Sequence, residues 1–233
     1  ENQELELFIE TTSLAVARET KLDKLLTLGR EFRPESLTEL ILPPLGQKIA
    51  IASDLAFSFA YPHILQGWKK AGAELSFFSP LTDEAPKEDC DAIFLPGGYP
   101  ELHAGQISQN HQFLNGLRNS KALIYGECGG YMVLGDALID AQGHSHAMAG
   151  LLPVTTSFAS RKLHLGYRQL TPLGGPWTKP LRGHEFHYSS IASEGSADRL
   201  FAASDASGQD LGSIGQRRGH VMGSYAHIIC EAP

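Results

Sequence analysis

Residues 122–130 read Ala-Leu-Ile-Tyr-Gly-Glu-Cys-Gly-Gly, and this stretch decides the fold. An apolar run ends at Gly126, Cys128 follows, and Gly129 and Gly130 begin a second apolar run with helical spacing. Gly-x-Cys-x-Gly is the cysteine counterpart of the nucleophile elbow, a sharp strand-to-helix turn that exposes one side chain. Small neighbours are needed because the turn leaves no room for a Cβ on either side. The pattern predicts that Cys128 is a nucleophile, and the alternative is a cysteine that only packs in the core.

Strands and helices alternate from Lys48 onward. The predicted strands are 49–52, 75–78, 92–95 and the run before Cys128, and the predicted helices are 62–71 and 106–118. This alternation predicts an α/β fold with a mostly parallel, flavodoxin-like sheet and helices on both faces. The segments 154–158, 163–170, 184–191 and 211–225 are interpreted as antiparallel additions. Because ligands of such sheets bind at the carboxyl ends of the strands, the elbow falls where a site is expected.

The composition is that of an ordinary globular protein, with 42% hydrophobic and 19% charged residues among 233. No apolar run approaches the roughly 20 residues of a membrane span, and the acidic first residues do not resemble a secretory signal. Three widely spaced cysteines argue for a reducing compartment, so we expect a cytoplasmic protein. A net charge of −7 gives no footprint for nucleic acid, and no P-loop motif is present.

Residues 1–46 do not resemble the start of a domain. A leucine-rich helical face at 22–28 ends at Gly29, and a proline-containing stretch follows. We interpret 1–46 as the tail of a preceding domain plus its linker, and 47–233 as the domain that carries the elbow. The chain begins without methionine, which agrees with a fragment of a longer protein.

A cysteine nucleophile needs a base and donors for a developing oxyanion. A helix N-terminus also favours thiolate over thiol, so we expect the helix after Cys128 to activate it. His227 follows an apolar run late in the chain, and a strand end there would bring it to Cys128 as the base. The amides of Gly98 or Gly97, together with that of Gly129, are the candidate oxyanion donors. The alternative for the glycine pair is a tight turn alone.

The histidine-rich segment His184-Glu185-Phe186-His187 resembles part of a zinc motif but lacks the spacing His-Glu-x-x-His. On a strand, its two histidines would lie on opposite faces, so we expect no metal. Cys90 and Cys230 have no elbow around them and are expected to be inert.

Seven motifs in order resemble the C-terminal glutamine amidotransferase domain of the cobyrinic or hydrogenobyrinic acid a,c-diamide synthases. They occupy residues 52–61, 78–81, 95–101, 126–132, 165–168, 183–189 and 223–227. The most distinctive read Leu-Pro-Gly-Gly-Tyr-Pro-Glu, Gly-Glu-Cys-Gly-Gly-Tyr-Met, Gly-His-Glu-Phe-His-Tyr-Ser and Gly-Ser-Tyr-Ala-His. The resemblance covers about residues 48–228.

This resemblance implies the glutaminase half of an ATP-dependent amidotransferase of cobalamin biosynthesis. Cys128 would attack the carboxamide of glutamine, and His227 would act first as base and then as acid. The ammonia would pass to an N-terminal synthetase domain, which uses ATP and Mg²⁺ to activate the a- and c-acetate carboxylates of a corrinoid. This chain would then need no cofactor of its own. Glu101 and Tyr131 are the candidate contacts to glutamine, and a homodimer is left open.

One position departs from the family pattern. Many class I glutamine amidotransferases have Glu two residues after the catalytic His, and this branch often has His there, whereas this chain has Ile229. We therefore expect another group to orient His227, with Glu185, His187 or a backbone carbonyl as candidates. Low glutaminase activity without the synthetase half is a further expectation.

The sequence leaves three other functions open. The glutaminase domain of cobyric acid synthase shares this chemistry but amidates other carboxylates, and the full runs at 57–61 and 183–189 favour the a,c-diamide branch. A non-catalytic binding module is kept open by Ile229, although the intact Cys128 and His227 argue against it. A stand-alone cysteine hydrolase or redox sensor would be indicated by reversible oxidation of the cysteine without glutamine hydrolysis.

Overall fold

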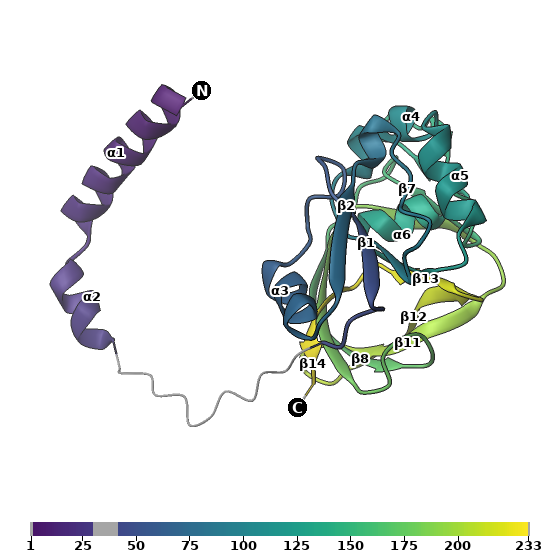
Figure 1. The fold of residues 1–233 in the computed structure, drawn as a ribbon. Coiled ribbons are helices and arrows are strands. Elements are labelled where there is room, and N and C mark those ends of the chain that lie inside the picture. The colour runs from purple at the N-terminus through teal and green to yellow at the C-terminus, as the bar shows by residue number, and fades with distance from the viewer. Residues whose placement is uncertain (1, 30–41, 233) are drawn as a thin grey trace. The chain divides into compact units, whose positions relative to one another are not determined.

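A computed structural model describes residues 2–29 and 42–232 of the chain (Figure 1). These residues fall into two separate units. The first contains α1 (Asn2–Glu19), which the sequence did not predict, and α2 (Leu22–Leu28). The second helix confirms the predicted leucine-rich face, and it ends where the amide of Gly29 bonds to the carbonyl of Leu26. Most of the predicted linker lies outside the described residues, so the boundary at residue 46 stays a prediction.

The second unit is built on a parallel sheet. Its strands are β1 (Lys48–Ala52), β2 (Glu74–Phe78), β3 (Ala92–Leu95), β4 (Leu123–Glu127) and β13 (Val221–Ser224). They lie in the order β2-β1-β3-β4-β13, and each neighbouring pair is parallel. This is the flavodoxin-like strand order, which confirms the predicted fold class. The carboxyl ends of β3 and β4 therefore lie side by side, and Cys128 follows directly from β4.

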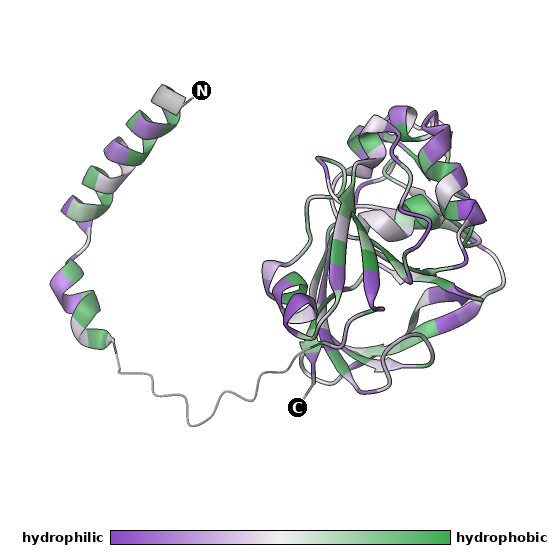
Figure 2. Cartoon of the chain, viewed as in Figure 1, coloured by the Kyte–Doolittle hydropathy of each residue, from purple (hydrophilic) through white to green (hydrophobic). Residues whose placement is uncertain are grey.

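Alternation along the strands divides the core into two layers. On β1, Ala50 and Ala52 face a layer that holds the helices α4 (Ala104–Ile107), α5 (His111–Asn119) and α6 (Gly129–Leu134). Ile49 and Ile51 face the other layer, where Trp68 of α3 (Pro62–Lys70) packs. In Figure 1, α3 lies on one side of β1 and β2, and α5 and α6 lie on the other. Figure 2 shows hydrophobic residues along these strands and hydrophilic ones on the outer turns of α3 and α5.

Antiparallel strands extend the sheet beyond β13. They are β12 (Asp210–Arg218), β11 (Asp198–Ser204), β8 (His164–Pro172), β9 (Leu181–His187) and β14 (His227–Glu231), in that order. Only Tyr225 and Ala226 separate the end of β13 from the start of β14, although four strands lie between them in the sheet. This part of the sheet must therefore curl back on itself. The curl returns the first residue of β14, His227, to the end of the parallel sheet.

A small second sheet and two single turns complete the unit. The sheet has the order β10 (Ser190–Glu194), β7 (Val154–Ser157), β5 (Ala137–Ile139) and β6 (Ser145–Ala147), and the turns are η1 (Pro80–Thr82) and η2 (Pro100–Leu102). Two predicted strands are divided, since 184–191 contributes to β9 and β10, and 211–225 to β12 and β13. No helix in residues 2–29 and 42–232 has both the length and the hydrophobicity to cross a membrane.

Candidate active site

Cys128 occupies a strained turn between β4 and α6. Its φ of 46° and ψ of −102° place it outside the conformations that a residue with a Cβ ordinarily adopts. The turn is held from both sides, because the Cys128 amide donates to the Ser224 carbonyl at 2.8 Å and the Gly130 amide to the Pro96 carbonyl at 3.1 Å. A Cβ at Gly130 would collide with the carbonyl of Leu95, so the sequence needs glycine there. The predicted nucleophile elbow is confirmed as a backbone geometry.

A cavity of about 90 Å³ lies in front of Cys128. It is lined by Phe59, Gly98, Tyr99, Glu101, Cys128, Met132, Phe158, Phe186, His187 and Tyr188. Burial raises the pKa of Glu101, and the positive charge of Arg161 partly opposes this shift. The structure thus brings one of the two predicted glutamine contacts, Glu101, to the nucleophile. Its role in binding stays a prediction.

Two of the three predicted oxyanion donors, Gly98 and Gly129, approach each other beside the cysteine. A Cβ at Gly129 would lie 3.1 Å from the nitrogen of Gly98, so these two backbone segments approach closely. A Cβ at Gly98 would collide with the carbonyl of Ala56, and one at Gly97 would collide with the ring of His227. Both positions therefore need glycine, because each backbone lies too close to a neighbouring group to carry a Cβ. This arrangement places two candidate N–H donors at the carboxyl edge of β3 and β4.

The resting thiol differs from the expected activated thiolate. Burial raises the pKa of the Cys128 thiol to about 12, and the hydrogen bond from the Gly129 amide acts in the opposite direction. The amide at the helix N-terminus acts in the predicted direction, but the net shift in this state favours thiol over thiolate. The helix after the cysteine has only six residues, and removal of the thiol from water outweighs its field.

His227 lies in a stack of polar rings. It packs against His184 with ring centroids 4.9 Å apart and planes 7° apart, and the hydroxyl of Tyr61 is hydrogen-bonded to Nε2 of His184. Burial lowers the pKa of His227 to about 4, and the nearby His184 and His187 lower it further. The ring is therefore neutral near pH 7 and has a lone pair available for a proton.

Glu127 approaches His227 from the end of β4. Its Oε1 accepts a hydrogen bond from the Ile228 amide at 3.1 Å, and its Oε2 lies 3.8 Å from Nδ1 of His227. Both side chains are only 3% exposed. Burial raises the pKa of Glu127 to about 8. Glu127 belongs to the elbow motif, but the sequence indicates no role for it, because its proximity to His227 depends on the curl of the sheet.

Two predicted orienting groups have other partners. Glu185 is bound by Arg168 at 2.6 Å and 3.0 Å, and Nδ1 of His187 donates to the Ser189 carbonyl at 3.0 Å. No described residue makes a hydrogen bond to Nδ1 of His227, which excludes a backbone carbonyl in that part of the chain. At position 229 the backbone carbonyl of the isoleucine faces His63, at 2.9 Å from Nε2. The prediction that Glu185, His187 or a backbone carbonyl orients His227 is therefore wrong for the described residues in this geometry.

Comparison with known proteins identifies the family. Residues 48–233 match the family of CobB/CobQ-like glutamine amidotransferase domains. The chain belongs to this family. It is 54% identical to the hydrogenobyrinate a,c-diamide synthase of Brucella anthropi, over 98% of this chain and 54% of that protein. It is 48% identical to the protein of the same name from Rhizobium meliloti, over 98% and 54% of the two chains.

The chain spans about half the length of the curated relatives it matches. A crystal structure of a glutamine amidotransferase from Thermotoga maritima superposes with a TM-score of 0.52 at 14% identity. The match covers 79% of this chain and 76% of that one. At this identity it supports the fold alone.

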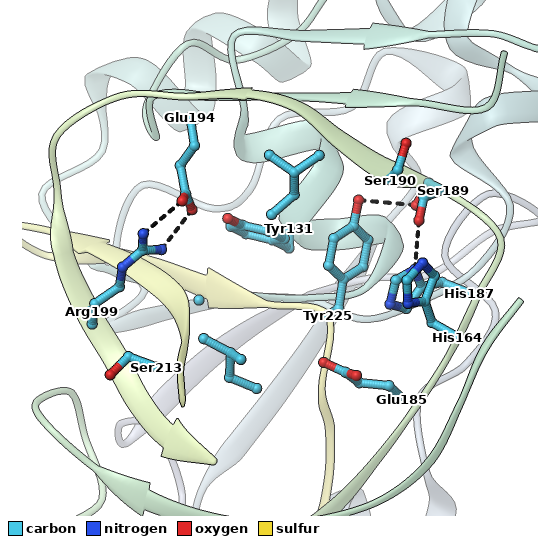
Figure 3. A pocket seen from close by; sticks show the side chains of 13 residues that line it. Tyr131, His164, Glu185, His187, Ser189, Ser190, Glu194, Arg199, Ser213 and Tyr225 are labelled. Atoms are coloured by element: carbon cyan, nitrogen blue, oxygen red, sulfur yellow. Dashed lines mark hydrogen bonds and ion pairs between the residues drawn. The ribbon is translucent and has the colours of Figure 1, made fainter. Parts of the chain in front are cut away.

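A second cavity of the amidotransferase domain, about 330 Å³ in volume, shares His187 with the cysteine cavity (Figure 3). Three stacked rings form one wall, with His187 between Tyr225 at 3.8 Å and His164 at 4.7 Å. The Ser189 hydroxyl donates to the Tyr225 hydroxyl at 3.0 Å and fixes that ring. The two cavities are therefore separated by this stack.

Tyr131 lines the second cavity and not the cysteine cavity. Its ring meets Tyr225 edge-on at 5.5 Å, and its hydroxyl has no hydrogen-bond partner among the described residues. Figure 3 shows it beside the ion pair of Arg199 and Glu194, whose atoms are 2.7 Å apart. Its predicted contact with glutamine is untested, and the structure places it behind Tyr225.

The described residues contain no group of three or more His, Cys, Asp or Glu side chains that could hold a metal ion. His184 and His187 do turn to different neighbours, His227 and Tyr225 respectively. Cys90 and Cys230 are half-buried free thiols, and burial raises the pKa of both.

Proposed function

We propose that this chain is the glutaminase half of an ATP-dependent amidotransferase. It hydrolyses glutamine with Cys128 and supplies ammonia for amidation of the a- and c-side-chain carboxylates of hydrogenobyrinic or cobyrinic acid. The observation that carries the proposal is the strained elbow, which holds a buried cysteine beside two glycine amides in a member of the amidotransferase family. The elbow strain is of the kind that persists at functional sites.

The proposed chemistry uses Cys128, His227 and the two glycine amides. His227 takes the proton of the thiol, and the sulfur of Cys128 attacks the carboxamide carbon of glutamine. The amides of Gly98 and Gly129 donate to the oxyanion that forms. His227 then returns the proton to the leaving nitrogen, which departs as ammonia and leaves a γ-glutamyl thioester. Water, deprotonated by the same histidine, cleaves the thioester to glutamate and regenerates the thiol.

The electrostatics of the resting site support low activity of the chain alone. Moving a proton from a thiol with a pKa of about 12 to an imidazole with a pKa of about 4 is strongly uphill. We infer that the ion pair gains further stabilisation when glutamine is bound or the synthetase half is docked. Coupling of hydrolysis to synthesis would prevent waste of glutamine.

The acceptor and the partner are inferred from the relatives. The proteins compared above are named for hydrogenobyrinate a,c-diamide synthesis, and this chain matches about half of each. We infer that the other half is a synthetase domain that binds ATP, Mg²⁺ and the corrinoid, and that the glutaminase half binds no cofactor itself. This favours the a,c-diamide branch over cobyric acid synthase. A metal-free substrate is favoured by the same names.

Alkylation by a diazoketone analogue of glutamine tests the proposal. Peptide mass mapping is expected to find the adduct on Cys128, with Cys90 and Cys230 serving as internal controls. Free glutamine should protect the site, and glutamate should protect it less. Equal labelling of all three cysteines, with the synthetase half present, would refute a glutamine site at the elbow.

A further inference from the structure

The base of this site needs a partner for its second ring nitrogen. An imidazole accepts the thiol proton at Nε2 only if the other nitrogen, Nδ1, carries the hydrogen, and an acceptor at Nδ1 fixes that tautomer. In His227, Nδ1 is the nitrogen that faces Glu127, so a proton from the thiol would be accepted at Nε2. Stacking on His184 fixes the plane of the ring but supplies no acceptor at its edge.

Glu127 is held in place for this role. One carboxyl oxygen is anchored by the Ile228 amide at 3.1 Å, and the other points at Nδ1 from 3.8 Å. Hydrogen bonds of this kind form at about 2.7–3.2 Å, so a ring shift of less than about 1 Å completes the contact. The anchor belongs to the residue that follows His227, so the carboxylate and the imidazole are tied to the same backbone.

We propose that Glu127 is the positioning residue for His227, and that it takes the place of the carboxylate that many class I glutamine amidotransferases have two residues after the histidine. The inference rests on the proposed function of His227 as base. Glu127 holds the Nδ1–H tautomer, and it stabilises the imidazolium that forms when the thiol gives its proton to Nε2. The orienting carboxylate and the nucleophile are then consecutive residues, 127 and 128, at the end of one strand.

Consecutive placement has a geometric reason. Side chains alternate along a strand, so the residue before the nucleophile points to the opposite side, into the protein. There it meets β14, which the curl of the antiparallel part brings to this edge. A single β-strand terminus thus presents the thiol to the cavity and the carboxylate to the histidine.

The test compares Glu127→Gln with the matched control Glu231→Gln. Glu231 is also a buried carboxylate and lies on the strand that begins with His227, but it pairs with Lys179 at 2.8 Å. In the E127Q variant the amide oxygen can keep the bond from the Ile228 amide, and the amino group then faces Nδ1. A donor at that place favours a proton on Nε2, which is the wrong tautomer for a base.

Two measurements are made on the full chain. Nitrogen-15 NMR of histidine-labelled protein reports which ring nitrogen carries the proton, and a His227→Gln variant assigns the signal. At a pH above the pKa of Glu127, which is about 8, we expect the Nδ1–H form in the wild type and in E231Q, and the Nε2–H form in E127Q. Glutamine hydrolysis with the synthetase half present is expected to lose about 10²–10⁴-fold in kcat in E127Q with little change in KM, and nothing in E231Q.

The outcomes separate this inference from the proposed function. An Nε2–H form in the wild type at a pH where Glu127 is ionised overturns the positioning role, and this spectrum needs no variant to fold. E127Q turnover close to that of the wild type also overturns it. If the tautomers are as expected while neither the wild type nor E231Q hydrolyses glutamine, Glu127 still sets the tautomer of His227 and the proposed function fails.

Discussion

Replacing Gly97 with alanine is expected to disable the base and leave the fold intact. A methyl group at this position would lie 3.1 Å from Nε2 and 3.2 Å from Nδ1 of His227, and closer still to Cε1. Carbon atoms in contact prefer about 3.5–4.0 Å, so the ring must retreat by roughly 1 Å. A catalytic group misplaced by about 1 Å costs on the order of 10²-fold in rate, which is about 2.7 kcal/mol in the activation barrier.

The assay is glutamine hydrolysis in the presence of the synthetase half, with thermal unfolding measured in parallel. Gly105→Ala is the control, because a methyl group there would meet only His146, at an ordinary contact distance of 3.6 Å. We expect kcat to fall about 10²-fold in the Gly97→Ala variant and to be unchanged in the control. A Gly97→Ala variant with wild-type kcat would refute the reasoning, since the ring would then have room that the structure does not give it.

Two further predictions concern strain and pH. Cys128→Gly is expected to be more stable than Cys128→Ala by about 1 kcal/mol in chemical denaturation, because only glycine relieves a φ of 46° without a Cβ; equal stabilities would mean that the elbow stores no strain. Glutamine hydrolysis is expected to rise with pH through about 8, since Glu127 must be ionised before Oε2 can accept from Nδ1–H and its pKa is about 8. The E127Q variant should lose this rise, and a rise that persists would assign it to another group. The titratable groups that face Glu127 are Tyr61, Tyr125, Cys128 and His227.

The parallel half of the fold could be predicted because its signals are local. The run Ile49-Ala50-Ile51-Ala52 is buried on both faces, and such continuous apolar strands are typical of parallel sheets. The glycines around Cys128 are explained by contacts within the elbow itself. These features depend on a few neighbouring residues, so they can be predicted from the sequence.

The antiparallel half was harder to predict from the sequence because its strands are partly exposed and interrupted. The strand β11 (Asp198–Ser204) was not predicted, since its short apolar centre at Leu200 and Phe201 is flanked by polar and small residues. The run 211–225 contains Gly219, whose φ of 62° makes the turn that divides β12 from β13. Only the pairing of β13 with β4 shows that its last part joins the parallel sheet.

The site was predicted in its parts but not in its electrostatics. Sequence spacing identified Cys128, His227 and the glycine amides as candidates, and the structure places the histidine against Gly97 at the strand edge. Sequence spacing could not reveal Glu127 as the neighbour of His227, because that contact joins residues 100 positions apart through the curl of the sheet. The raised pKa of the thiol likewise follows from burial, which motif spacing does not report.

The short connection between β13 and β14 limits how this protein can vary in length. The amide of Cys128 is bonded to the carbonyl of Ser224, and His227 follows only three residues later. An insertion or deletion at Tyr225 or Ala226 would change the register between the nucleophile and the base. By contrast, the turns at 140–144 and 205–209 lie on the surface, where added residues alter no strand of the site. Drift in chain length among homologous domains should therefore be tolerated at those turns and eliminated at the dipeptide before His227.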